Sequence, residues 1–127
     1  FPEKLIGFDP EYFLHHHING QLKIKGVLED SVFQEYLRCY RNPETIHAIC
    51  EDYRAAATID LEDDKADSDK KIQCPLYLLW GARGTVANSM TWSDKALNVS
   101  GEALDCGHSP EEECPEVFLE KLKTFLG

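Results

Sequence analysis

The feature that most constrains the fold is a continuous apolar run bounded by proline and glycine, residues 75–81 (PLYLLWG). Such a run is typical of a strand buried on both faces of a parallel sheet. The chain offers one companion, a short apolar segment at 103–106 that is followed by Gly107-His108. Because a two-stranded pair is only marginally stable, these strands require neighbours. We therefore expect the 127 residues to belong to a larger α/β sheet, whose other strands this sequence does not supply.

Helices are predicted before the first strand. Apolar residues at helical spacing, with Asp, Ser or Asn near the start, predict helices over residues 10–18, 31–40 and 43–57. The Asn-Gly pair at 19–20 is expected to end the first of these. The acidic stretch 60–71 is expected to be a loop or a frayed helix end.

The second half alternates between strands and helices. Residues 82–91 are expected to form a loop and 92–97 a short helix, followed by the strand at 103–106. Residues 109–112 (SPEE) fit a capping box with proline at the first helical position. A last helix is predicted from Pro115 onward. The fold class is therefore α/β.

The charge excludes two classes of partner. The chain has 23 acidic and 13 basic side chains, a formal net charge of -10. Binding to nucleic acid needs a basic face, and binding to an anionic membrane surface needs basic residues as well. No apolar run reaches the roughly 20 residues of a membrane helix. We expect neither nucleic acid nor a membrane as a partner, and we interpret the acidic stretch 51–70 as a solvated face.

The cysteines indicate a reducing compartment. There are five, an odd number, and none forms a CxxC pair. We expect free thiols and a cytoplasmic protein. The start, Phe1-Pro2-Glu3-Lys4, has neither an initiator methionine nor the pattern of a signal peptide. The chain is therefore expected to begin inside a longer one.

His108 is the candidate catalytic residue. It follows the carboxyl end of the second predicted strand, and open α/β sheets place ligands and reactive groups at that edge. A neutral imidazole there could act as a general base on water or on a nucleophile. The alternative is a loop histidine that forms local hydrogen bonds.

Two further features are candidate binding residues. Tyr53 lies on the apolar face of its predicted helix and could aim its hydroxyl at a ligand, or it could be a core tyrosine with its hydroxyl at the rim. The three histidines at 15–17 cannot face one metal ion, because consecutive helical residues point about 100° apart. The sequence contains no GxSxG, HExxH, calcium-loop or phosphate-loop motif. We expect no metal and no cofactor.

Several segments together resemble haloacetate (fluoroacetate) dehalogenases, a family with the α/β-hydrolase fold. They are residues 50–58 (CEDYRAAAT), 60–67 (DLEDDKAD), 72–75 (IQCP), 79–82 (LWGA), 105–108 (DCGH) and 112–116 (EECPE). The resemblance covers essentially the whole chain. It implies that residues 1–58 are the end of a helical cap with a return helix. Residues 59–127 would be the C-terminal part of the core, with its last two parallel strands and flanking helices.

The resemblance also implies roles. In that family an Asp displaces halide from the substrate carbon, a His activates water to hydrolyse the resulting ester, and a second Asp orients the His. His108 matches the general base, and Tyr53 matches a cap tyrosine that helps bind the leaving halide. Trp92 matches a position without an assigned role, and we expect it to line the pocket.

This chain departs from the family pattern. The nucleophilic and orienting aspartates of the family belong to its N-terminal half, so the isolated chain is expected to be inactive. Ser109-Pro110 replaces a bulky apolar pair, which leaves the pocket shape open. The complete parent is expected to take a small-molecule substrate, a 2-haloacid, and could form a homodimer. The alternatives are an epoxide hydrolase or esterase of the same fold, and a non-catalytic remnant or interaction module.

Overall fold

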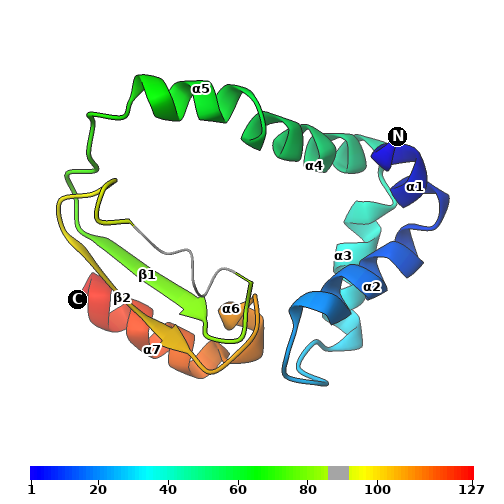
Figure 1. Ribbon diagram of the computed structural model, residues 1–127. Helices are drawn as coiled ribbons and strands as arrows, with labels where there is room; N and C mark the ends of the chain where they lie inside the picture. Colours follow the sequence, from blue (N-terminus) through cyan, green and yellow to red (C-terminus); the bar gives the residue numbers. More distant parts are fainter. Residues whose placement is uncertain (86–91) are drawn as a thin grey trace. The chain divides into compact units, whose positions relative to one another are not determined.

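The structure is a computed structural model that describes residues 1–85 and 92–127 (Figure 1). The elements follow in the order α1 (Pro2–Phe8), α2 (Pro10–Gln21), α3 (Asp30–Tyr40), α4 (Pro43–Ala56), α5 (Ile59–Ala66), β1 (Leu76–Gly81), β2 (Val99–Leu104), α6 (Pro110–Glu113) and α7 (Pro115–Leu126). None of the helices described is long and apolar enough to cross a membrane.

The chain forms two compact units. The first, here called the helical unit, consists of Phe1–Ile18 and Glu29–Asp69. The second, the sheet unit, consists of Asn19–Leu28 and Lys70–Gly127. The division predicted after residue 58 follows the family resemblance and stays a prediction.

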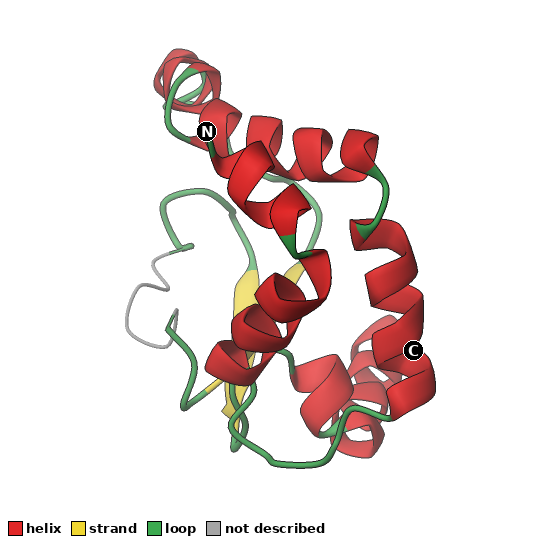
Figure 2. Cartoon of the chain, turned by 90° about the vertical axis from the view of Figure 1, so that its right-hand side faces the viewer, coloured by secondary structure: helices red, strands yellow, loops and turns green. Residues whose placement is uncertain are grey.

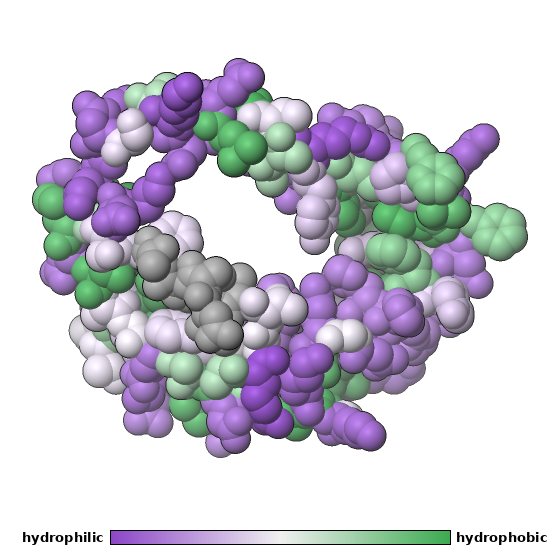
Figure 3. Space-filling view, in the orientation of Figure 1, coloured by the Kyte–Doolittle hydropathy of each residue, from purple (hydrophilic) through white to green (hydrophobic). Residues whose placement is uncertain are grey.

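The helical unit has a small apolar core between α1 and α4. Ile6 of α1 contacts Ile46 and Cys50, which lie four residues apart and therefore on one face of α4. Phe13 and Tyr40 pack against this cluster. Apolar side chains also remain exposed, and Figure 3 shows them gathered at the α1 end of this unit.

The sheet unit contains a two-stranded parallel sheet, as the sequence predicts. β1 pairs with β2 from Leu76↔Val99 to Gly81↔Leu104, and Figure 2 draws the two strands in yellow. Helix α7 packs on the sheet through a stacked pair of rings, Tyr77 and Phe125, whose centroids are 5.1 Å apart. Glu102 of β2 accepts a hydrogen bond from the Tyr77 hydroxyl at 2.8 Å and forms an ion pair with Lys121 at 2.9 Å.

The end of one predicted helix and the structure predicted for the acidic stretch 60–71 were wrong. Helix α2 continues through the Asn-Gly pair to Gln21, because Gly20 does not adopt the positive φ with which glycine ends a helix. Gly26 has that conformation instead, with φ of 76°. The stretch expected to be a loop or frayed end contains helix α5, whose first turn carries Asp60 and Glu62. Acidic side chains there interact favourably with the helix dipole.

The second strand and the segment before it also differ from the prediction. Residues 92–97 form a turn and a bridge instead of a helix, because Ile72 pairs with the backbone of Lys95 and Leu97 at 2.8 and 3.1 Å. This pairing leads directly into the β1–β2 register, so β2 begins at Val99 and ends at Leu104. Part of the loop predicted at 82–91 lies outside the described residues.

Candidate functional site

The carboxyl ends of β1 and β2 hold the loop that carries His108. After Gly81, the Ala82 N–H donates to the Leu104 carbonyl at 2.8 Å and the Arg83 N–H donates to the Cys106 carbonyl at 3.0 Å. The Arg83 guanidinium also contacts Asp105, at 3.1 Å from its carboxylate and 2.8 Å from its carbonyl. The backbone at 105–106 is therefore tied to the end of β1.

His108 lies at this edge with its side chain exposed. Its N–H donates to the Gln21 carbonyl at 3.1 Å, so the backbone of His108 is held while its imidazole remains accessible. The residue before it, Gly107, packs its carbonyl against Gly81. This is the position that a general base needs if a ligand binds at the carboxyl edge of the sheet.

Cys106, two residues before His108, is fully buried. Burial and the neighbouring Cys114 thiol raise the pKa of Cys106 to about 12. The thiol is therefore protonated at neutral pH and is not a nucleophile. All five cysteines are free, as the sequence predicts.

Tyr53 lies on α4 and is 68% exposed. It lines a pocket of about 480 Å³ within the helical unit, and the pocket wall is mainly apolar. The other residues that line it are Pro2, Leu5, Ile6, Phe13, His17, Tyr40, Ile49, Cys50, Arg54 and Ala57. Tyr53 thus lines a mainly apolar pocket, and Arg54 is another of its lining residues.

The remaining candidates are placed as follows. Trp92 is 40% exposed and its carbonyl accepts the N–H groups of Lys95 and Ala96 in a turn. Trp92 and His108 belong to the sheet unit, whereas Tyr53 belongs to the helical unit. The histidines at 15–17 stack on three different rings, those of Phe33, Tyr12 and Phe13. The roles of these residues stay predictions.

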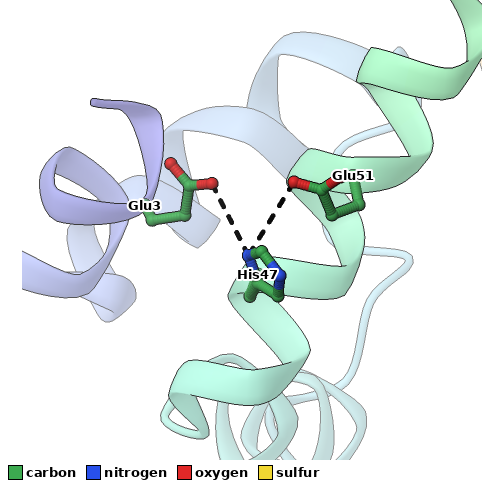
Figure 4. A group of neighbouring side chains, drawn as sticks. All are labelled: Glu3, His47 and Glu51. Carbon is green, nitrogen blue, oxygen red and sulfur yellow. Dashed lines mark ion pairs between the residues drawn. The ribbon is translucent and has the colours of Figure 1, made fainter.

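An ion-pair network joins α1 to α4 (Figure 4). The His47 Nδ1 atom lies 3.8 Å from Glu3 and 4.0 Å from Glu51. The three side chains could offer ligand atoms within 4.8 Å of one another. However, the Arg54 guanidinium already pairs with both carboxylates. A cation would have to displace Arg54, so we interpret the network as a structural contact.

This network predicts a pH dependence of stability. A backbone hydrogen bond and the Arg54 guanidinium lower the pKa of Glu3 from 4.5 to about 2. A lowered folded-state pKa means that the stabilisation is present above pH 4.5 and is lost as the pH falls toward 2. Glu3→Gln should therefore lower the thermal midpoint near neutral pH and have no effect at the acid end of this range.

The control for this measurement is Asp52→Asn, which changes an exposed acid on α4 outside the first helical turn. Its thermal midpoint should follow that of the wild type at every pH. If the effect of Glu3→Gln persisted unchanged in acid, the stabilisation would not come from the ionised carboxylate.

Comparison with known proteins reveals what the chain is similar to. A fluoroacetate dehalogenase from Burkholderia sp is 31% identical over 131 residues, which covers 99% of this chain and 43% of that protein. A solved structure of a proposed acyltransferase from Salmonella enterica is 63% identical, with a TM-score of 0.94, and the match covers 98% of this chain and 43% of that one. No family model matches the chain.

The description of a second similar structure names its fold. It is a proposed α/β hydrolase from Nostoc sp PCC 7120, 42% identical with a TM-score of 0.93, and the match covers 99% of this chain and 45% of that one. The chain has the fold of the C-terminal part of an α/β-hydrolase. A proposed epoxide hydrolase from Pseudomonas aeruginosa is 37% identical, with a TM-score of 0.90 over 98% of this chain and 44% of that one.

The expected fold class, the C-terminal part of an α/β-hydrolase, is therefore confirmed. The resemblance to haloacetate dehalogenases over the whole chain is confirmed as well. The chain spans less than half the length of the relatives that it matches.

The sequence does not single out Glu113, which lies five residues after His108. In a row of three glutamates at the start of α6 it looks like helix-terminal charge, yet it is 5% exposed. No sequence signal separates it from Glu111 and Glu112, because the three glutamates are consecutive and only the fold buries Glu113. The expected capping box is wrong, because the Ser109 side chain makes no capping bond.

Proposed function

We propose that the protein hydrolyses the carbon–halogen bond of a small 2-haloacid, with His108 as general base. The observation that carries this proposal is the position of His108 at the carboxyl edge of the parallel sheet, with its backbone held and its imidazole exposed. The dehalogenase relative, matched along 99% of the chain, supports this choice of reaction.

The proposed reaction has two steps. An aspartate outside residues 1–127 attacks the substrate carbon, so that a carbon–oxygen bond forms and the halide leaves with its electron pair. His108 then takes a proton from water, and the resulting hydroxide attacks the carbonyl carbon of the enzyme ester. The ester bond breaks, the leaving oxygen takes up a proton, and a 2-hydroxy acid and the free aspartate result.

Tyr53 would assist the first step. Tyr53 lines a mainly apolar pocket, and its hydroxyl can donate a hydrogen bond to a halide ion. In this proposal Tyr53 donates to the leaving halide, and Trp92 lines the substrate pocket. Residues 1–127 by themselves should release no fluoride, because the nucleophile is outside them.

The test uses the protein expressed from the complete coding sequence that contains residues 1–127. His108→Ala should release about one halide per enzyme and then stop, because only the second step needs the imidazole. Mass spectrometry should show the trapped ester on the enzyme. His16→Ala, which changes an exposed histidine on α2, is the control and should turn over normally.

A second candidate function is acyl transfer or ester hydrolysis, since the Salmonella enterica structure described as a proposed acyltransferase is 63% identical. There a serine would be the nucleophile, and its activation would itself require His108. His108→Ala would then prevent adduct formation altogether. An epoxide hydrolase would form the trapped ester from an epoxide without releasing halide. A non-catalytic module would form no adduct with any of these substrates.

A further inference from the structure

Glu113 has a buried carboxylate that accepts hydrogen bonds from backbone groups distant in the sequence. Its Oε2 atom accepts hydrogen bonds from the N–H groups of Lys23 and Ile24, at 2.7 and 2.8 Å. Within the described residues its Oε1 atom is buried and has no hydrogen-bond partner. Burying a carboxylate is costly unless hydrogen bonds compensate it. A glutamate that only interacts with the helix dipole can stay exposed to water, as Glu111 does. The burial of Glu113 therefore requires another explanation.

The segment that Glu113 binds is the segment that holds His108. Lys23 and Ile24 lie two and three residues after Gln21, and the Gln21 carbonyl accepts the His108 N–H at 3.1 Å. The Glu113 carboxylate therefore holds one end of the segment 21–24, at residues 23–24. The backbone of His108 is bonded to the other end, at Gln21. The two hydrogen bonds to Glu113 join residues 90 and 89 positions apart in the sequence, so they do not arise from local structure.

Gly107 completes this arrangement. A Cβ atom on Gly107 would lie 2.5 Å from the Gln21 carbonyl oxygen, 2.5 Å from Glu113 Oε1 and 2.8 Å from the Lys23 nitrogen. The residue before His108 is thus enclosed by the carboxylate and by the segment that the carboxylate binds. Movement of either would move the backbone on which the imidazole is mounted.

We propose that Glu113 is a positioning residue for His108. Its carboxylate fixes residues 23–24, which fixes the Gln21 carbonyl and through it the His108 backbone. Hydrogen bonds to a charged acceptor are roughly twice as strong as neutral ones, which suits a carboxylate to this task. The expected consequence for turnover rests on the proposed function, whereas the structural part of the proposal does not.

The structural test is amide hydrogen exchange, followed by NMR on the protein expressed from the complete coding sequence that contains residues 1–127. Glu113→Ala should speed the exchange of the Lys23, Ile24 and His108 amides at least about tenfold, since a lost hydrogen bond to a charged group changes the opening equilibrium by that much or more. The Leu78 amide, in the middle of β1, should stay unchanged and report that the sheet is folded. The control is Glu111→Gln, an exposed acid on the same helix.

Glu113→Gln keeps the shape and one acceptor oxygen but removes the charge. It should give an intermediate exchange rate at the same three amides. If these amides exchanged as in the wild type in both variants, the proposal would be overturned. If Leu78 exchanged as fast as His108 in both, Glu113 would be a general stabilising residue, which would overturn it as well.

The functional readout uses the protein from the complete coding sequence. Glu113→Gln should lower kcat by about 10²-fold, the cost of a small misplacement of a catalytic group, with KM little changed. Halide release in the first turnover should keep its rate, and only hydrolysis of the ester should slow. Loss of both steps together would contradict a role through His108. If His108→Ala formed no adduct, the proposed function would fail while the exchange results still decided the role of Glu113.

Discussion

Replacing Gly81 with alanine is expected to unfold the sheet unit. An alanine Cβ there would lie 1.5 Å from the Gly107 carbonyl oxygen, 2.6 Å from its carbon and 2.8 Å from the Cys106 carbonyl oxygen. All three are backbone atoms, so no side chain can move aside. The end of β1 and the loop at 106–107 must separate, which breaks the hydrogen bonds that hold the His108 loop. We expect a destabilisation of more than about 4 kcal/mol, measured by urea denaturation.

Gly20→Ala is the matched control for this substitution. Gly20 lies in α2, does not have a positive φ, and has no atom within 4 Å of the position where a Cβ would lie. Alanine is the better helix former by about 1 kcal/mol, so this variant should be as stable as the wild type or more stable. If Gly81→Ala were as stable as Gly20→Ala, the close approach of Gly81 to the backbone of Cys106 and Gly107 would be refuted.

Leu37→Ala is expected to produce the second large effect, in the helical unit. Leu37 has no exposed surface, and Phe33, which lies one turn before it on α3, is also buried. Removing a buried leucine side chain loses its transfer free energy and leaves a cavity, at a cost of about 2–5 kcal/mol. The measurement is the urea midpoint followed by helical circular dichroism.

Leu61→Ala provides the comparison within the same unit. Leu61 lies on α5 and is 62% exposed, so its truncation should change the free energy of unfolding by less than about 0.5 kcal/mol. A Leu37→Ala variant with an equally small change would mean that α3 does not contribute to a cooperative core.

The elements that could be predicted are those with a strong local signal. The apolar run 75–81 carries its own boundaries, and β1 occupies Leu76–Gly81 within it. Helix α4 begins at a proline after Asn42, whose side chain accepts the Glu44 N–H at 3.0 Å, the contact that such a pair predicts. In both cases the sequence and the fold favour the same structure.

The elements that were misplaced depend on distant partners. Nothing local in residues 92–97 reveals that Ile72 will pair with their backbone, so a turn was expected to be a helix. The start of β2 is likewise set by its register with Leu76. A strand boundary depends on where the partner strand lies, and that information is not contained in the segment itself.

The candidate site divides in the same way. The place of His108 at the carboxyl edge of the sheet could be predicted because the Gly-His pair follows an apolar segment, whereas its role stays a prediction. Glu113 could not, because the sequence presents three consecutive glutamates as equivalents. Only one of them is buried against Lys23 and Ile24.

The sequence alone determined the α/β class, the parallel pair of strands and the resemblance to haloacetate dehalogenases. Apolar periodicity and local motifs are properties of the chain itself. Folding decides which groups support His108. The Gln21 carbonyl, the Glu113 carboxylate and the glycine contact at Gly81 come from segments far apart in the sequence. Hydrogen bonds and steric contacts act over a few ångströms in space, so these groups become partners only when the sheet unit has folded.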